Sequence, residues 1–98
     1  MIGYGPIGYM PKHHDYLFLA EIGRRLTAKR DDMGYSQQAV ADAAKITPQM
    51  LSRYELGLAD PPLSTLVRIT SALQMSPTAL LIQSMILAEP DPAHRPQP

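Results

Sequence analysis

SQQAVADAAKITPQMLSRYELG, residues 36–57, is the stretch that decides the fold of this chain. Ser36 and Thr47 are residue types that cap helix N-termini, because their side-chain oxygens accept amide hydrogens that the first turn leaves unpaired. A proline follows Thr47 at the first helical position, where its missing N–H removes no hydrogen bond. The stretch therefore predicts two short helices, 37–44 and 48–56, which are stable only if they pack together.

Apolar residues at helical spacing predict three further helices around this pair. The first covers residues 16–33 and ends before Gly34, a residue suited to a C-terminal cap. The others cover 63–73 and 77–87, and the latter again begins after a serine, Ser76, with a proline at its first position. We expect the following residues to face the core: Leu19, Ile22, Leu26, Met33, Val40, Ala41, Ala44, Leu51, Tyr54, Leu66, Ile69 and Leu73.

The two ends of the chain differ in composition from its centre. Residues 1–15 are rich in glycine, tyrosine and proline, which oppose regular structure, so we expect a flexible arm. A second interpretation is that the arm packs on a partner subunit through Tyr4 and Tyr9, or reaches DNA through Lys12. Residues 89–98 contain four prolines and predict a disordered tail. The domain is expected over residues 16–88.

Composition excludes several classes of protein. The chain of 98 residues has no cysteine, which excludes disulfides and thiolate metal sites. No apolar run approaches the roughly 18 residues that span a membrane, and no secretory signal is recognisable, so a cytoplasmic protein is expected. His13, His14 and Asp15 are adjacent and His94 is in the opposite tail, so we expect no metal site. No catalytic constellation or cofactor-binding loop is present in the sequence, so an enzyme is not expected.

Five segments, in this order and at this spacing, resemble the Cro-type phage-repressor family, also called lambda-repressor-like or Xre. They are Ile22–Leu26, Gly34–Gln37, Ser52–Gly57, Pro61–Leu66 and Ala72–Ser76. The resemblance implies an all-α, five-helix lambda-repressor-like DNA-binding domain with a helix-turn-helix. Its second short helix would enter the major groove of double-stranded DNA.

The first turn of that second helix predicts which residues contact DNA. Gln49 can pair with adenine, Arg53 can pair with guanine or bind a phosphate, and Met50 can contact a thymine methyl group. The resemblance implies the same roles for these three positions, and implies that Gln37 binds a phosphate at a helix N-terminus. The complete expected DNA-binding set is Gln37, Lys45, Thr47, Gln49, Met50, Ser52 and Arg53.

The resemblance also implies a structural ion pair between Arg30 and Glu55. Lys45 stands where relatives carry a turn glycine, so we expect it to adopt a positive φ. Pro48 replaces a side chain that forms hydrogen bonds in many relatives, and Asp60 would repel phosphate. The net charge of the chain is zero, and residues 21–57 carry six basic and five acidic side chains. We therefore expect modest DNA affinity for each monomer.

The predicted helix 77–87 is apolar around most of its circumference, with Gln83 and Ser84 as its polar residues. A terminal helix of a small monomer normally keeps a hydrated face. We therefore expect homodimerisation through Ile82, Met85 and Ile86, with an inverted-repeat operator as the binding site and repression as the mode of regulation. Two alternatives remain, an antitoxin-type protein whose main partner is a toxin and an adaptor of the same fold without DNA binding.

Overall fold

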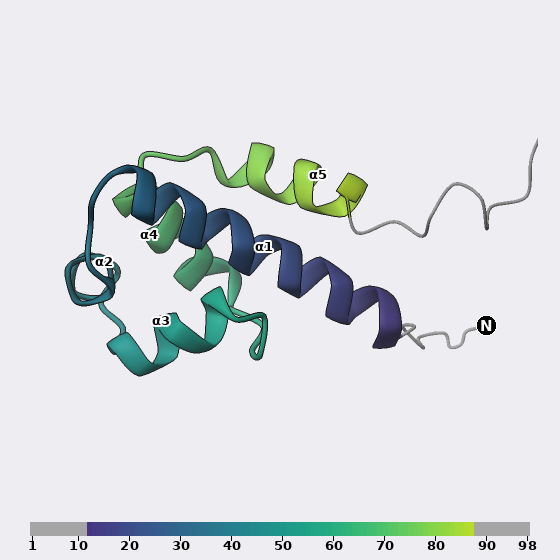
Figure 1. The fold of residues 1–98 in the computed structure, drawn as a ribbon, viewed down its shortest axis with the longest axis horizontal. Helices are drawn as coiled ribbons and strands as arrows, with labels where there is room; N and C mark the ends of the chain where they lie inside the picture. Colours follow the sequence, from purple (N-terminus) through teal and green to yellow (C-terminus); the bar gives the residue numbers. More distant parts are fainter. Residues whose placement is uncertain (1–11, 88–98) are drawn as a thin grey trace, which may run out of the picture.

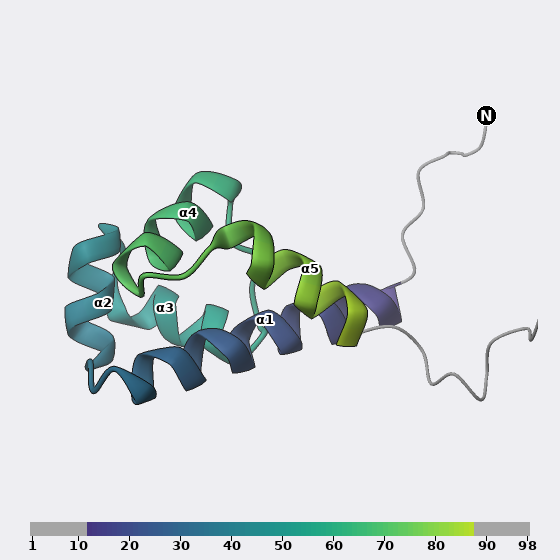
Figure 2. The same cartoon turned by 90° about the horizontal axis from the view of Figure 1, so that it is seen from above.

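The computed structural model describes the backbone of residues 12–87 and the side chains of residues 16–86. Within this part of the chain there are five helices and no strand: α1 (Lys12–Asp32), α2 (Gln37–Ala44), α3 (Pro48–Glu55), α4 (Leu63–Ala72) and α5 (Pro77–Leu87). The long helix α1 lies between α3 and α5, which pack on opposite sides of it (Figure 1). Helix α2 packs against α3 and α4, and α5 runs antiparallel to α1 (Figure 2). The predicted all-α, five-helix architecture is confirmed.

Four of the five predicted helices agree with the structure to within one residue. The predicted start of the first helix at Tyr16 is wrong, because α1 begins at Lys12. Residues 12–15 contain no glycine or proline, so the helix continues back to the position that follows Pro11. The proposed contacts of Tyr4, Tyr9 and the Lys12 side chain, the histidines considered for a metal, and the tail 89–98 lie outside the described residues.

The predicted N-terminal caps are present in the structure. The Ser36 hydroxyl accepts a hydrogen bond from the Ala39 amide at 3.0 Å, and Thr47 accepts one from the Met50 amide at 3.1 Å. Ser76 caps α5 in the same way, through the Ala79 amide at 3.1 Å. Each cap satisfies an amide that the first turn leaves without an intrahelical partner. The cap signals at the starts of α2, α3 and α5 are therefore local and correct.

The core is formed by residues from all five helices. Most of the residues predicted to face inward are buried, whereas Leu19 and Met33 are half-buried. Ala41 is fully buried between α2 and its neighbours, and its carbonyl oxygen accepts the Ile46 amide of the turn at 3.0 Å. The buried cluster comprises Ile22, Leu26, Val40, Ala41, Ala44, Leu51, Tyr54, Leu66, Ile69, Leu73 and Leu80.

Ser84 departs from the sequence expectation. It was expected to contribute, with Gln83, to a polar side of α5, but it is fully buried. Its hydroxyl oxygen has no hydrogen-bond partner among the described residues. The reason is geometric, because Ser84 lies one turn after Leu80 and shares its inward face. The exposed face of α5 is consequently more apolar than the sequence suggests.

Replacing Ser84 with alanine should raise the free energy of unfolding by about 1 kcal/mol, because an unpaired buried hydroxyl costs about 1–3 kcal/mol. Urea denaturation followed by circular dichroism measures the change. The matched control is Thr70→Val, because the Thr70 hydroxyl is also fully buried but donates to the Leu66 carbonyl oxygen at 3.0 Å. Thr70→Val should lower stability, and a Ser84→Ala protein less stable than the parent would contradict the burial of an unpaired hydroxyl.

Enlarging Ala41 should push α2 away from α3. We expect Ala41→Leu to lower the free energy of unfolding by roughly 1–3 kcal/mol, because a filled core has no space for three more carbon atoms. Ala43→Leu, at an exposed position of the same helix, is the control and should unfold like the parent. Thermal denaturation of both variants tests this, and equal midpoints would show that α2 and α3 do not pack closely here.

Candidate nucleic-acid interface

Helix α3 has one face in the core and one face in solvent. Leu51, Tyr54 and Glu55 are buried, whereas Gln49 and Arg53 are exposed and lie one turn apart. The Thr47 hydroxyl oxygen accepts the capping hydrogen bond from the Met50 amide, and the Thr47 side chain is exposed at the surface of this turn. The exposed face of α3 therefore presents one long amide and one guanidinium in the same direction.

Two glycines allow α3 to approach α1 closely. A Cβ atom on Gly23, inside α1, would lie 2.5 Å from the carbonyl oxygen of Tyr54 and closer still to that of Glu55. Gly57, just after α3, has a φ of +73°, and a Cβ there would lie 2.8 Å from the Cα of Ala20. The sequence analysis missed the role of Gly23. The signal was available, because a glycine inside a helix that otherwise lacks one usually has a packing reason.

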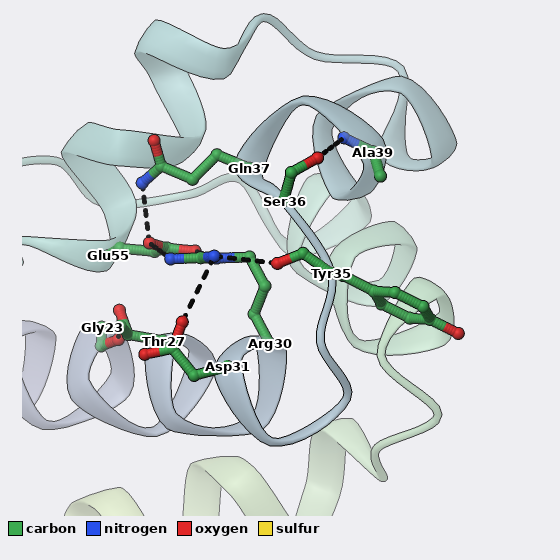
Figure 3. Close-up of polar contacts among 9 residues, drawn as sticks. All are labelled: Gly23, Thr27, Arg30, Asp31, Tyr35, Ser36, Gln37, Ala39 and Glu55. Carbon is green, nitrogen blue, oxygen red and sulfur yellow. Dashed lines mark hydrogen bonds and ion pairs between the residues drawn. The ribbon is translucent and has the colours of Figure 1, made fainter.

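A buried ion pair joins the end of α3 to α1 (Figure 3). Arg30 donates from Nε to Glu55 Oε2 at 2.7 Å and from Nη2 to Glu55 Oε1 at 3.1 Å. The side chains are 13% and 5% exposed, respectively. Arg30 also donates to the Tyr35 carbonyl oxygen at 3.0 Å, in the connection before α2. The structure thus brings together the two residues that the sequence analysis paired.

Gln37 belongs to the same cluster. Its side-chain amide donates to Glu55 Oε1 at 2.8 Å, so the carboxylate accepts hydrogen bonds from α1 and α2 at once (Figure 3). A side-chain amide carries two hydrogens, and only one is needed for this bond. The second hydrogen of Gln37 remains available to an anion at the N-terminus of α2. The hydrogen bond with Glu55 raises the pKa of Arg30, which therefore stays charged at all accessible pH values.

The turn between α2 and α3 depends on Lys45. This residue has φ 61° and ψ 42°, which is the left-handed conformation that the sequence analysis expected. Its backbone amide bonds to carbonyl oxygens at the end of α2, and its side chain is exposed. A non-glycine residue is uncommon in this conformation, so Lys45 places a cation at the turn at some conformational cost.

Met50 and Ser52 are less available than the sequence suggested. Both are half-buried, and Met50 packs against the core cluster. Arg53 donates from Nη2 to the Leu58 carbonyl oxygen at 3.3 Å, a long hydrogen bond at the exposed end of α3. Leu56 and Leu58, in the connection that follows α3, are themselves exposed. The polar groups that α3 offers to a ligand are therefore mainly those of Gln49 and Arg53.

Several cations are used within the structure. Arg24 and Arg25 both bind Glu21, and hydrogen bonding from Arg24 lowers the pKa of that carboxyl. Arg68 donates to the Ala44 carbonyl oxygen at 2.8 Å and so caps the end of α2, a role that the sequence analysis missed. Around α2 and α3, the cations exposed to solvent in the described part of the chain are those of Lys45 and Arg53.

Other kinds of site are not seen in the described region. Residues 12–87 contain no helix that is both long and apolar enough to span a bilayer. Among the described side chains, those of residues 16–86, no group of three or more histidine or acidic residues is placed to bind a metal ion.

Comparison with known sequences identifies similar proteins. The helix-turn-helix family HTH_3 matches residues 26–80, more than half of the chain. The chain is 44% identical over 59 residues to the SPbeta prophage-derived uncharacterized HTH-type transcriptional regulator YonR of Bacillus subtilis (strain 168). This match covers 60% of the chain but 55% of that protein, so the similarity concerns about half of the relative.

Solved structures show the same fold. The clp gene regulator ClgR from Corynebacterium glutamicum superposes with a TM-score of 0.64 at 28% identity, covering 69% of this chain and 88% of that one. The restriction-modification controller protein C.AhdI from Aeromonas hydrophila gives 0.61 at 26% identity, covering 63% and 94%. An HTH_3 family transcriptional regulator from Vibrio cholerae gives 0.65 at 30% identity, covering 74% and 41%.

Removing the Glu55 carboxylate should destabilise the domain. We expect Glu55→Ala to lower the free energy of unfolding by about 3 kcal/mol, because it leaves the largely buried Arg30 with only the exposed Asp31, at 3.4 Å, as its anion. Glu21→Ala removes the same charge from the two ion pairs with the more exposed Arg24 and Arg25 within α1 and should cost about 1 kcal/mol or less. Urea denaturation of the two variants provides the comparison. Equal, small losses would show that the Arg30–Glu55 pair behaves like a surface pair.

Proposed function

Since the chain belongs to the helix-turn-helix family HTH_3, whose match covers residues 26–80, we propose that it is a DNA-binding transcriptional regulator. The observation that best supports this proposal is the way in which α3 is fixed to α1. The helix is held to α1 by the buried ion pair and by the close approach at Gly23, while Gln49 and Arg53 are exposed. A helix fixed in this way, with an exposed amide in its first turn and an exposed guanidinium one turn later, suits the major groove of double-stranded DNA.

In this proposal Gln49 contacts bases and Arg53 contacts either a guanine or a phosphate. The exposed part of Met50 would reach a thymine methyl group, and its buried part would keep α3 in place. The phosphate contacts come from Gln37, Lys45 and the exposed groups of Thr47 and Ser52, near the N-termini of α2 and α3. Backbone amides at those two termini favour anions as well.

We further propose that the protein acts as a homodimer on an inverted repeat. The exposed side chains of Ile82, Met85 and Ile86 support this, because they form an apolar face on α5. Helices α3 and α5 lie on opposite sides of α1, so self-association through α5 leaves α3 uncovered (Figure 1). A two-fold pair would place two copies of α3 on successive major grooves, about 34 Å apart. Repression by occupancy of a promoter is the simplest consequence.

Neutral net charge favours a second candidate function. In an antitoxin-type or adaptor protein of the same fold, a toxin or another protein would be the main partner, bound through the apolar face of α5. Such a protein would bind nucleic acid weakly or not at all. A regulator and an adaptor therefore differ in the salt dependence of DNA binding.

Substitutions on α3 test base contact directly. Gln49→Ala and Arg53→Ala should each weaken binding to duplex DNA from the region upstream of the gene by about 1–3 kcal/mol per subunit, as loss of a base contact does. Electrophoretic mobility shift measures the dissociation constants. Arg24→Ala, an exposed arginine on α1 paired with Glu21, is the charge-matched control and should bind like the parent. If neither α3 variant changes affinity, this helix does not contact bases.

The same titrations at several salt concentrations separate the candidates. With Lys45 and Arg53 of each subunit near phosphates, a dimer should show a slope of about −4 for the logarithm of the association constant against that of the salt concentration. A flat dependence would favour the adaptor. Co-purification of a toxin-like partner together with weak DNA binding would favour the antitoxin.

A further inference from the structure

We propose that residues 1–11 of one copy of the chain cover the apolar α5 face of a second copy. This proposal rests on the homodimer of the proposed function and adds the segment that completes its interface. The α5 face is defined here as Ile82, Met85 and Ile86 together with the exposed Ala79. The three large side chains are 53%, 58% and 60% exposed.

The composition of α5 indicates an apolar partner. None of its eleven residues carries a charge, and its Ser84 hydroxyl points into the core. Gln83 borders the α5 face, and its side-chain oxygen accepts a hydrogen bond from Arg25 of α1 at 3.0 Å. Thr78, one turn before Ile82, is a further exposed polar residue on this side of the helix. A face without a charged residue forms no ion pair with an acidic or basic ligand, so an apolar protein surface is the partner that fits it.

The size of the face indicates that α5 alone does not make a stable dimer. Three large apolar side chains and an alanine expose a few hundred Å². A specific protein interface buries about 800 Å² on each partner. The α5 face alone therefore leaves a deficit in buried area, which the surface of residues 1–11 fills when each copy covers the α5 face of the other.

Residues 1–11 match this deficit in composition and length. They carry no charged side chain and include Ile2, Tyr4, Ile7, Tyr9 and Met10. Eleven residues can extend over about 36–40 Å. In an extended chain Ile7 and Tyr9 would point to the same side, and the segment is long enough to span the ~16 Å length of an eleven-residue helix such as α5. Tyrosines give large contact areas at low entropic cost.

The course of the chain indicates a second copy as the acceptor. Helix α1 begins at the end of the molecule where α5 ends, as both views show (Figures 1 and 2). The chain therefore enters α1 near the C-terminal end of α5. To run along its own α5, a segment that precedes α1 would have to reverse direction at the start of α1. A second copy beside this end of the molecule can be reached without that reversal.

Self-association of the full chain, without DNA, tests the proposal. The arm variant combines Tyr4→Ser, Ile7→Ser and Tyr9→Ser, and the control combines Pro92→Ser, His94→Ser and Pro96→Ser in the opposite tail. Sedimentation equilibrium should show at least a tenfold rise in the dimer dissociation constant for the arm variant alone, with unchanged helicity by circular dichroism. An unchanged constant would overturn the proposal. A lower dimer dissociation constant for the arm variant would also overturn it, because it would mean that the segment covers the α5 of its own chain and blocks dimerisation.

Disulfide trapping identifies the acceptor chain, because the natural sequence has no cysteine. A copy with Tyr9→Cys is mixed with a copy with Ile86→Cys and oxidised. A cross-linked heterodimer is expected, and the pair His94→Cys with Ile86→Cys is the control. In a chain that carries both Tyr9→Cys and Ile86→Cys, a disulfide within one monomer would contradict the contact between two copies. Neither readout involves DNA, so a failure of DNA binding and a failure of this interface are distinguishable.

Discussion

The contact between Glu55 and Arg30 is the interaction on which the position of α3 and of its exposed face depends. Helix α3 has eight residues, too few to be stable alone, so its direction is set by what it touches. A carboxylate at a helix C-terminus opposes the helix dipole, and the buried guanidinium of Arg30 offsets this. Because Gln37 donates to the same carboxylate, α1, α2 and α3 meet at one group. The N-terminal half of α3, with Gln49, is left free to meet a ligand.

The chain has a net charge of zero, and most basic side chains of residues 16–86 form contacts within the fold, so few are left on the exposed face of α3. Most arginines in the described part of the chain stabilise the fold: Arg30 holds α3, Arg68 caps α2, and Arg24 and Arg25 bind Glu21. The proposed affinity then depends on a few well-placed contacts and on pairing two copies rather than on a broad basic surface. Separation of the α3 and α5 surfaces by α1 allows both to be occupied together (Figure 1).

Local signals in the sequence predicted the starts of α2 to α5, most of the core and the backbone of the turn between α2 and α3. Thr47 caps α3, and Lys45 adopts a positive φ, because both depend on a few adjacent residues. What the sequence did not predict depends on tertiary packing. Gly23 matters because α3 crosses α1 at that residue, Arg68 because it reaches a carbonyl 24 residues away, and Ser84 because its face of α5 turns inward. The DNA-contacting roles of Gln49 and Arg53 remain proposals, since exposure makes a side chain available without naming its partner.

Selection of duplex DNA by the full-length protein from a random pool tests the central claim most directly, because it examines binding, sequence preference and symmetry together. If the mounted helix α3 contacts bases in a two-fold pair, the selected molecules should share an inverted repeat with half-site centres about 10–10.5 base pairs apart, or a multiple of that spacing. A pool that shows no enrichment after repeated rounds at low salt would contradict the account.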